Sequence, residues 1–587
     1  MRIQELIEAA QGKRRLSLLI QNVDVLNIFT GELIRASIGI YGDRIAYVGP
    51  DSMDAEKTID GNGLAAVPGL IDTHLHIESS MVVPSRFAEA VLPHGTTTVC
   101  ADPHEIANVL GKDGIRMMLE NAKDLPMKIY FFASTCVPES NAVTAGAEIK
   151  PEDVEEMLEW EGIVGLGEVM DYEGVVNNDP KMVKILEIGH KHNAVIDGHC
   201  VLLQGAKLNA YVAVGPEADH ENFTVETALD KLRAGMYLKL RGPYILDTRK
   251  FVQALKQLPN PWNIILVTDD VMPDNLIDKG HLDHVVRAMI DAGMDEVEAV
   301  RSVTYRPAQH MRMYNLGAIA PGKIADIILL KNLRRFEIDT VISNGVVVAK
   351  EQRLLVNIRH KPFDDRARNT VKLQNLSIDD FYVKPPVENG KVKVHVIDFT
   401  KYVGEIADPA AAFLDMILTK LNTAEVEVRN GDFILGDVAL VLVFERHGKN
   451  RNRGVGFVRN LIHKGAVAST IAHDSHNMIV VGTNREDMYK AAQLVIESRG
   501  GTAAIMDSRT LAHIQLPIAG LMSEEQVEKV AEKMKQLRRA FKEMQVLDHP
   551  YMPLINLLTL SVIPHARITD KGIFDVNRQQ FIPWIAE

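Results

Sequence analysis

Cysteine is scarce in this sequence. The 587 residues contain only Cys100, Cys136 and Cys200, and no two of them form a CxxC pair. An odd number of cysteines spread over a long chain does not fit a disulfide framework, and without CxxC pairs a zinc site built from thiolates is not expected. A reducing compartment is therefore the expected location, and the cytoplasm is the simplest one.

Long apolar segments are also missing. The first residues, MRIQELIEAAQGKRR, have the pattern of a short amphipathic helix with a basic end and lack the apolar stretch of a signal peptide. No apolar run approaches the length that is needed to cross a bilayer. The sequence therefore predicts no membrane association.

Positive charge is in deficit. Lys and Arg number 65 against 78 Asp and Glu, which gives a formal net charge of −13. A broad nucleic-acid surface needs the opposite balance, because Lys and Arg are the residues that neutralise phosphates. A small or neutral substrate fits this composition better than nucleic acid.

The hydrophobic content of 46% is ample for more than one core, and the length predicts about three folding units. Residues 17–50 and 317–350 both alternate short β-branched runs with turn residues, which predicts one small β-sandwich made from both segments. The chain after residue 380 combines further β runs with a strongly amphipathic helix pattern at 523–545. The predicted units are residues 1–66 (N-terminal helix and first part of the sandwich), 67–315 (barrel), 316–360 (second part of the sandwich) and 380–587 (C-terminal α+β domain).

The middle region alternates short apolar strands with helical stretches. The eight candidate strands are AAVPGLIDTHLH, TTTVCADPHE, KIYFFASTCVP, IVGLGEVM, AVIDGHC, AYVAVGPEADHE, MYLKLRG and NIILVTDD. Eight β/α repeats predict an α/β fold of the (β/α)8 TIM-like barrel type, in which polar residues at the C-terminal ends of the strands carry the chemistry.

The first polar signal is the pair His74 and His76 at the end of the first strand. Residues two apart on a strand point to the same side, so both imidazoles reach one point in space, which suits a divalent transition metal. Two ordinary polar histidines are the competing interpretation, and the preceding apolar strand with Pro-Gly favours the metal.

Further polar residues end the other candidate strands. They are Glu168 on the fourth, His199 on the fifth, His220 on the sixth and Asp269 on the eighth. Each has a structural alternative as a cap, turn or rim residue, but four histidines and two acids at strand ends are hard to attribute to chance. A carboxylate has two oxygens that can each take one ion, so Glu168 can bridge two metals. Such a pair activates a shared water and polarises the electrophile. Asp270 is expected to cap the following helix.

With these residues in place, the sequence resembles the amidohydrolase superfamily and, within it, the adenine deaminase family. The most specific stretches are PGLIDTHLHIESSM, HGTTTVCADPHEIANVLG, GLGEVM, LNAYVAVG with DHE, TDD followed by KGHLDHVVR, and AHDSHN followed by VGxxNR. The resemblance covers the barrel and its flanking β region and extends into the C-terminal unit. Strand four offers Glu168, as in adenine deaminases, where most amidohydrolases have a modified lysine.

The resemblance implies hydrolysis of adenine to hypoxanthine and ammonia in purine salvage, with Mn²⁺ or Fe²⁺ as a binuclear centre and a homodimer as the assembly. It implies that His74, His76 and Asp269 hold one ion, that His199 and His220 hold the other, and that Glu168 bridges them. Asp269 is the preferred proton shuttle and Glu221 the second candidate.

Other polar groups are assigned to the substrate. Asp102, His104 and Glu105 end strand two, where they are predicted to bind the purine, support the metals or hold an additional ion; a plain helix start is an equal alternative. His473, Asp474 and His476 are expected to reach the barrel mouth and close the purine site, and the group 445–447 is expected to do likewise. Residues 78–80 either support the metal histidines or act as a cap.

The chain departs from the family pattern in two places at the barrel mouth. Strand seven ends in Arg241-Gly242-Pro243, without the acid and serine that are usual there, and Arg241 is a predicted substrate contact. Cys200 and Val201 follow His199 where a small residue and proline are usual. The alternative is therefore an amidohydrolase acting on a different aminopurine or a cyclic amide. A non-enzymatic scaffold is the less favoured alternative, because such proteins usually lose metal ligands and this chain keeps all of them. A deaminase that flips bases out of nucleic acid is not expected, since the H-x-E…P-C-x-x-C signature is missing.

Overall fold

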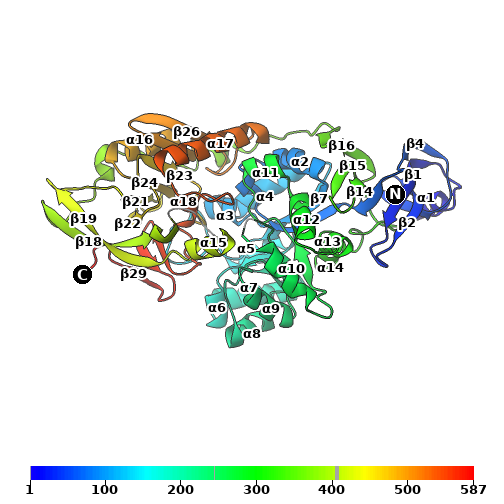
Figure 1. The fold of residues 1–587 in the computed structure, drawn as a ribbon, viewed down its shortest axis with the longest axis horizontal. Helices are drawn as coiled ribbons and strands as arrows, with labels where there is room; N and C mark the ends of the chain where they lie inside the picture. The colour runs from blue at the N-terminus through cyan, green and yellow to red at the C-terminus, as the bar shows by residue number, and fades with distance from the viewer. Residues whose placement is uncertain (1, 244, 403–408) are drawn as a thin grey trace.

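The computed structural model describes residues 2–243, 245–402 and 409–587. Three parts follow one another along the longest axis of the molecule (Figure 1): an N-terminal sheet at one end, an α/β barrel in the centre and a C-terminal part at the other end. Residues 1, 244 and 403–408, which belong to the predicted units 1–66, 67–315 and 380–587, lie outside the described residues.

The central part is a ring of eight short parallel strands. One run is hydrogen-bonded in the order β10-β9-β8-β7-β6 and the other in the order β11-β12-β13. Backbone hydrogen bonds close both seams, from Glu217 N to Ile196 O at 2.9 Å and from Asp269 N to His74 O at 3.0 Å. The strands are β6 (Leu70–Leu75), β7 (Thr96–Ala101), β8 (Lys128–Ala133), β9 (Ile163–Val169), β10 (Val195–Gly198), β11 (Ala218–Asp219), β12 (Tyr237–Leu240) and β13 (Ile264–Leu266).

Helices follow the strands and cover the outside of the ring. Helix α12 shows why they form, since it buries residues 282, 285, 286 and 289, the i, i+3, i+4, i+7 spacing of one helical face. The helices of this part are α2 (Pro84–Val91), α3 (His104–Leu110), α4 (Lys112–Ala122), α5 (Pro151–Met157), α6 (Tyr172–Val176), α7 (Pro180–Lys191), α8 (Gly205–Ala213), α9 (Val225–Arg233), α10 (Thr248–Lys256), α11 (Pro273–Lys279), α12 (Leu282–Asp291), α13 (Glu296–Ser302) and α14 (Tyr305–His310). The predicted α/β barrel is confirmed.

The sixth strand corrects the sequence prediction. The segment AYVAVG, read as a strand, lies largely in helix α8, and the strand itself is only the two residues of β11. Leu208 and Tyr211 are three positions apart and both buried, so the apolar run follows the helical period. A short apolar run does not by itself distinguish a strand from a buried helix.

The N-terminal part is one nine-stranded sheet that both predicted β segments share. Strand β5 joins them, because it pairs parallel with β1 and antiparallel with β14. The sandwich and the domain boundaries stay predictions. The elements are α1 (Ile3–Ala10), β1 (Leu16–Leu26), β2 (Leu33–Tyr41), β3 (Arg44–Gly49), β4 (Ala55–Asp60), β5 (Ala65–Pro68), β14 (Ile327–Asn332), β15 (Glu337–Ser343), β16 (Val346–Lys350) and β17 (Arg353–Leu354).

The C-terminal part contains a second nine-stranded sheet, in the order β20-β19-β18-β22-β21-β24-β23-β25-β26, and a three-stranded sheet, β27-β28-β29. Its strands are β18 (Gly390–Asp398), β19 (Leu421–Arg429), β20 (Asp432–Phe433), β21 (Val438–Phe444), β22 (Arg453–Arg459), β23 (Ala466–Ser469), β24 (Met478–Gly482), β25 (Gly501–Met506), β26 (Arg509–Gln515), β27 (Ala566–Thr569), β28 (Gly572–Asp575) and β29 (Gln580–Ile582). Its helices are α15 (Pro409–Ile417), α16 (Arg485–Glu497), α17 (Val527–Met544) and α18 (Leu554–Leu557).

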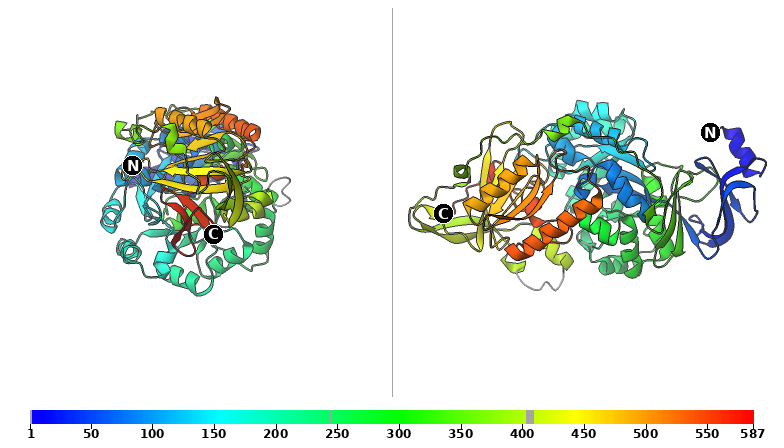
Figure 2. Two further views of the ribbon diagram at one scale, coloured as in Figure 1. Left: turned by 90° about the vertical axis from the view of Figure 1, so that its left-hand side faces the viewer. Right: turned by 90° about the horizontal axis from the view of Figure 1, so that it is seen from above.

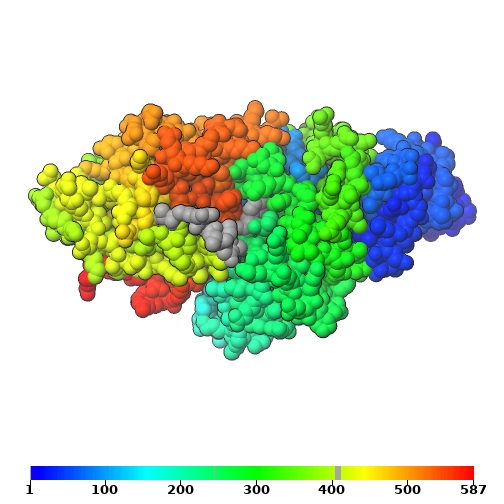
Figure 3. All heavy atoms as spheres, in the orientation of Figure 1, coloured from blue at the N-terminus to red at the C-terminus, as the bar shows by residue number. Residues whose placement is uncertain are grey.

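Helix α17 connects this part to the barrel. It packs on one side against strand β26 and on the other against helix α11 (Figure 2). The space-filling view shows the atoms of the C-terminal part in contact with the barrel along this junction (Figure 3). Among the described residues, no helix combines the length and the apolar character that a membrane crossing requires.

Candidate metal centre and active site

Six predicted metal ligands meet at the C-terminal ends of the barrel strands. None of their side chains is more than 6% exposed, so the cluster lies inside the barrel mouth. The six residues are His74 and His76 from β6 and the residue after it, Glu168 from β9, His199 after β10, His220 after β11 and Asp269 after β13.

Four of these side chains converge on one position. His76 Nε2 lies 3.0 Å from Glu168 Oε1 and 3.2 Å from Asp269 Oδ1. His74 Nε2 lies 3.6 Å and 3.5 Å from the same two oxygens. Two imidazole nitrogens and two carboxylate oxygens therefore surround one point, as the HxH spacing predicts.

The other oxygen of Glu168 faces a second pair of imidazoles. Glu168 Oε2 lies 2.7 Å from His199 Nδ1 and 3.4 Å from His220 Nε2. The two oxygens of one carboxylate thus serve two separate histidine pairs. This is the arrangement that a carboxylate bridging two cations requires.

The hydrogen bonding inside the cluster is incomplete. His74 Nε2, Glu168 Oε1, His199 Nε2 and His220 Nδ1 are buried without a hydrogen-bond partner. Each unsatisfied buried polar atom costs about 1–3 kcal/mol. Donor atoms of the groups His74–His76–Asp269 and His74–Glu168–His220 lie within 4.8 Å of one another. Imidazole and carboxylate donors in this arrangement fit divalent transition-metal ions, which satisfy such atoms when bound.

Contacts outside the cluster orient the imidazole rings of His74 and His76. The His74 Nδ1 atom lies 2.9 Å from Asp197 Oδ2, and the same oxygen accepts a 2.8 Å hydrogen bond from the buried ammonium of Lys239. The His76 Nδ1 atom lies 3.0 Å from the backbone oxygen of Asp102. These contacts leave both Nε2 atoms directed at the cluster, the usual way in which a protein presents metal-binding imidazoles.

Arg241 sets the electrostatics beside the metal cluster. Its guanidinium forms a 3.0 Å ion pair with Glu221 and a close ion pair with Asp269. Burial would raise the pKa of Asp269, but Arg241 and the imidazoles of His74 and His76 hold it well below its usual range. Burial does raise the pKa of Glu221, against the opposing effect of Arg241. Two acids on one arginine therefore differ in their affinity for a proton.

A cavity of about 70 Å³ lies directly beside the cluster. Its polar wall comes from the barrel and includes the predicted substrate contacts His104, Glu105 and Arg241. Its other wall comes from the C-terminal part of the same chain. That wall consists of Phe413, Ile417, His473, Asp474, Tyr551, Leu557, Leu560 and Ile563. The C-terminal part thus closes the pocket of its own barrel.

Other predicted contacts lie outside this cavity. Asp102 does not line it; its carboxylate accepts hydrogen bonds from Ser134 Oγ at 2.9 Å and from Glu168 N at 2.7 Å, and so supports strand β9. His476 does not line it either. Cys200 and Val201, expected to face the barrel mouth, are buried away from it, with Cys200 N bonded to Asp219. The unusual residues after His199 therefore do not shape the pocket.

Two structural alternatives are resolved by the contacts. Asp270 does not cap the next helix, which begins at Pro273 without a side-chain cap; Asp270 instead accepts hydrogen bonds from Ser79 and Tyr551. Glu78 accepts a 3.2 Å hydrogen bond from the backbone of Ile106. Ile106 lies in the first turn of helix α3, so the Glu78 contact is a capping contact, while Ser79 reaches Asp270 beside the metal cluster.

The group 445–447 also differs from the prediction, because it holds a loop and does not line the pocket. Glu445 accepts backbone hydrogen bonds from residues 447, 449, 450 and 451. The buried guanidinium of Arg446 donates to the His476 and Ala519 carbonyls. His447 lies 2.8 Å from the Ser475 carbonyl. These residues shape the 473–477 segment that reaches the barrel.

The sequence reasoning missed several residues. The Tyr551 hydroxyl donates a 3.0 Å hydrogen bond to Asp269 Oδ2, and no local sequence pattern indicates this contact. Asp197 and Lys239 did carry a signal, since Asp197 lies on strand β10, two positions before His199, and Lys239 interrupts an apolar strand. Strand residues two apart share a face, so both were open to the argument that found His74 and His76.

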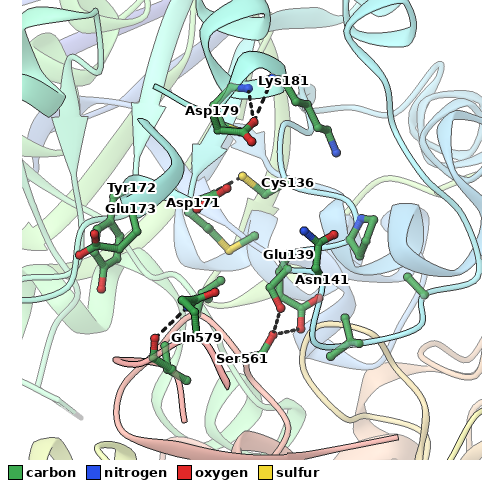
Figure 4. Close-up of a pocket in the computed structure, with 18 of the residues that line it drawn as sticks. Cys136, Glu139, Asn141, Asp171, Tyr172, Glu173, Asp179, Lys181, Ser561 and Gln579 are labelled. Atoms are coloured by element: carbon green, nitrogen blue, oxygen red, sulfur yellow. Dashed lines mark hydrogen bonds between the residues drawn. The ribbon is translucent and has the colours of Figure 1, made fainter. Parts of the chain in front are cut away.

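A larger cleft of about 790 Å³ adjoins the pocket at Met170, which lines both. The barrel loops after β8 and β9 form one side of it and residues 561–579 the other (Figure 4). Glu139 accepts a 3.0 Å hydrogen bond from Ser561 across this cleft. Met170 thus lies between the inner pocket and this outer cleft.

Known proteins show the same combination of parts. Residues 65–348 match the family model described as the amidohydrolase family, which is the class that the barrel and its histidine–carboxylate cluster define. Residues 416–580 match the model described as the adenine deaminase C-terminal domain. The chain belongs to the adenine deaminase family.

Relatives named adenine deaminase match along the whole chain. The one from Thermosipho africanus is 38% identical over 598 residues, covering 100% of both chains. The one from Clostridium acetobutylicum is 36% identical and covers 99% of this chain and 100% of its own. The one from Moorella thermoacetica is 39% identical and covers 99% of this chain and 98% of its own.

Proposed function

We propose that the protein hydrolyses adenine to hypoxanthine and ammonia. The observation that carries this proposal is the paired cluster in which the two oxygens of Glu168 face two separate histidine pairs. Full-length similarity to adenine deaminases supports adenine as the substrate. The barrel supplies the cluster, and the C-terminal part supplies the wall opposite it.

The metal ligands we propose are His74, His76 and Asp269 for one ion and His199 and His220 for the other, with Glu168 between them. The pattern of unsatisfied nitrogens and oxygens supports this division. When bound, a pair of divalent ions lowers the pKa of water and polarises the electrophile, so that water adds to an electron-poor carbon at neutral pH.

The chain's own acids move the protons. The net reaction adds water at C6 of adenine and releases the exocyclic nitrogen as ammonia, so one proton of the water must pass to that nitrogen and the other to ring nitrogen N1. We assign this transfer to the carboxylate of Asp269, with Glu221 as the second candidate. Arg241 holds both carboxylates, and Tyr551 donates to Asp269 Oδ2, so the acid is held in one orientation.

The pocket walls bind the flat base and exclude bulk water. His104 and Arg241 from the barrel and Asp474 from the C-terminal part provide polar edges, while Phe413, Leu557 and Leu560 provide apolar surface. A few placed polar groups on an otherwise apolar wall are typical of sites for small aromatic ligands. The contributions of Asp102 and of the group Glu105, His473 and His476 to substrate binding stay predictions from sequence.

The first test is ammonia release from adenine by protein reloaded with Mn²⁺, beside an Asp269→Asn variant. We expect adenine-dependent ammonia that the variant reduces by about 10³-fold or more, as for residues that act as a catalytic unit. No ammonia from the metal-loaded protein would exclude adenine and turn attention to another aminopurine or a cyclic amide. An undiminished rate in the variant would exclude Asp269 as the proton shuttle.

Finer properties of the enzyme also belong to this proposal. We assign Mn²⁺ or Fe²⁺ as a binuclear centre, which the imidazole and carboxylate donors support. A homodimer in the cytoplasm rests on the family resemblance and on the scarcity of cysteine. The division into a barrel, a flanking β-sandwich and a C-terminal α+β domain is part of the same assignment.

A further inference from the structure

A second group of histidine and carboxylate side chains lies at the junction between the barrel and the C-terminal part. Glu105 is in helix α3, directly after barrel strand β7, and His473 and His476 are in the segment between β23 and β24. Their exposed fractions are 3%, 5% and 0%. The group shares no residue with the six side chains of the paired cluster.

The three side chains point at one another. Glu105 Oε1 lies 3.1 Å from His473 Nδ1, and Glu105 Oε2 lies 2.7 Å from His476 Nε2. One donor atom from each residue fits within a 4.8 Å group. Two ligand atoms that are each about 2.1 Å from an ion, at a right angle, lie about 3 Å apart. The observed separations therefore have the size of the edges of a coordination shell.

Hydrogen bonding within the protein leaves three nitrogens of this group without a partner, while His473 Nδ1 faces Glu105 at 3.1 Å and Asp474 at 3.3 Å. Neither ring nitrogen of His476 has a hydrogen-bond partner, although Nε2 lies close to Glu105, and His473 Nε2 has none. The close approach of His476 to the carboxylate therefore lacks hydrogen-bond alignment. At least one nitrogen of a completely buried imidazole normally has a hydrogen-bond partner in the protein, so the lack of one here indicates an additional ligand.

A further carboxylate and a small cavity adjoin the group. Glu78 Oε2 is buried without a hydrogen-bond partner. Glu78, Glu105 and His473 line a cavity of about 10 Å³ together with Ser79 and apolar side chains. A space of about this size holds one water-sized occupant. Two buried carboxylates around such a space favour a cation over a neutral occupant.

We propose that Glu105, His473 and His476 bind a third divalent transition-metal ion, separate from the metal pair of the catalytic cluster. Two imidazoles and one carboxylate are an established ligand set for such ions and leave positions open for water or a further ligand. The ion joins helix α3 of the barrel to the C-terminal segment that reaches the pocket. By binding residues from both parts, it holds the two walls of the pocket at a fixed separation.

The test counts and locates the metal and does not depend on activity. Full-length protein is stripped with a chelator, reloaded with Mn²⁺, desalted and measured by elemental analysis. We expect three Mn²⁺ per chain in the wild type and two in His476→Gln. The matched control is His310→Gln, which replaces another buried histidine with no hydrogen-bond partner on either nitrogen. Its nearest carboxylate oxygen, on Glu217, is 3.9 Å away, against 2.7 Å between His476 and Glu105, and this variant should keep three ions. Two ions in the reloaded wild type, or three in His476→Gln, would overturn the proposal.

A second measurement uses the wild type and therefore still tests the proposal if the His476→Gln variant fails to fold. Crystals of the Mn²⁺-loaded wild type, measured at the manganese absorption edge, should give an anomalous peak between Glu105, His473 and His476. Glu105→Gln is the second variant for the metal count and should also retain two ions. If no anomalous peak appears between these three residues, the third site is overturned, even where the catalytic pair is occupied. A failure of the adenine assay with three ions bound would instead count against the proposed reaction alone.

Discussion

Two walls of unlike character face each other across the catalytic pocket. The barrel wall is polar and consists of strand ends, whose positions are set by the hydrogen-bond register of parallel strands, as with His76 and Glu168. The opposite wall is largely apolar and consists of short helices and loops, such as Phe413, Leu557 and Leu560. Hydrogen bonds, which are directional, fix the positions of the reactive side chains, while the burial of apolar side chains, which is not directional, closes the site.

The largest effect is expected from Glu168→Gln, which changes the centre of the barrel wall. An amide is neutral and cannot present an anionic oxygen to both histidine pairs, so both ions should bind more weakly. We expect kcat for adenine to fall by about 10³-fold or more and metal content to fall below two ions in the paired site. Glu173→Gln, an acid on the solvent-exposed rim of the outer cleft, is the control and should stay within about twofold, as is usual for surface changes. Full metal content in Glu168→Gln would contradict the bridging assignment.

The next effect concerns the layer behind the barrel wall. Lys239 is fully buried and holds Asp197, which in turn holds His74. Lys239→Met removes the cation of this buried ion pair and leaves the Asp197 charge without its counter-ion, which should cost about 3–5 kcal/mol of stability and lower Tm. Misplacing His74 should also weaken metal binding by about 10- to 100-fold.

A double variant distinguishes these two consequences. Adding Asp197→Asn to Lys239→Met removes the unpaired charge, so Tm should recover in part while metal affinity stays low. Differential scanning calorimetry and metal titration measure the two quantities separately. An unchanged Tm in Lys239→Met would show that the ion pair does not stabilise the barrel.

The two walls also differ in how far sequence could predict them. His74 and His76 share a strand face, and the other ligands end apolar strands, so the two-residue period and the barrel topology together predict that they meet. The helix over 205–213 was misread because a short apolar run fits either period. Tyr551 lies 282 positions from its partner Asp269, and only the folding back of the C-terminal part brings it there. No local pattern encodes a contact of that kind.

Tyr551→Phe tests whether the closing wall does more than exclude water. The variant keeps the ring but loses hydrogen bonds to Asp269 at 3.0 Å and Asp270 at 3.3 Å. A hydrogen bond to a charged group is worth about 1.5–3 kcal/mol, so kcat should fall by about 10- to 100-fold with little change in metal content. Tyr402→Phe, which loses a phenol–carboxylate contact with Asp415 away from the pocket, is the matched control. Equal rates in the two variants would assign Tyr551 to packing alone.

The smallest effect is expected where the walls meet at Glu139, which bonds to Ser561. Burial, followed by the nearby Asp474 carboxylate, raises the pKa of Glu139 to about 8. Since an unfolded Glu titrates near pH 4.3, the folded chain retains a proton that the unfolded chain has released between these values. The stability contributed by neutral Glu139 is therefore fully present below about pH 4 and is lost as the pH rises to about 8. Glu139→Gln stays neutral throughout, so the Tm of the variant relative to the wild type should rise between pH 5 and pH 8.5. Glu148→Gln on the exposed rim of the same cleft should show no such rise. A pH-independent difference for Glu139→Gln would mean that its carboxyl is already ionised in the folded protein, and that the junction between the two walls is more open to water than its burial indicates.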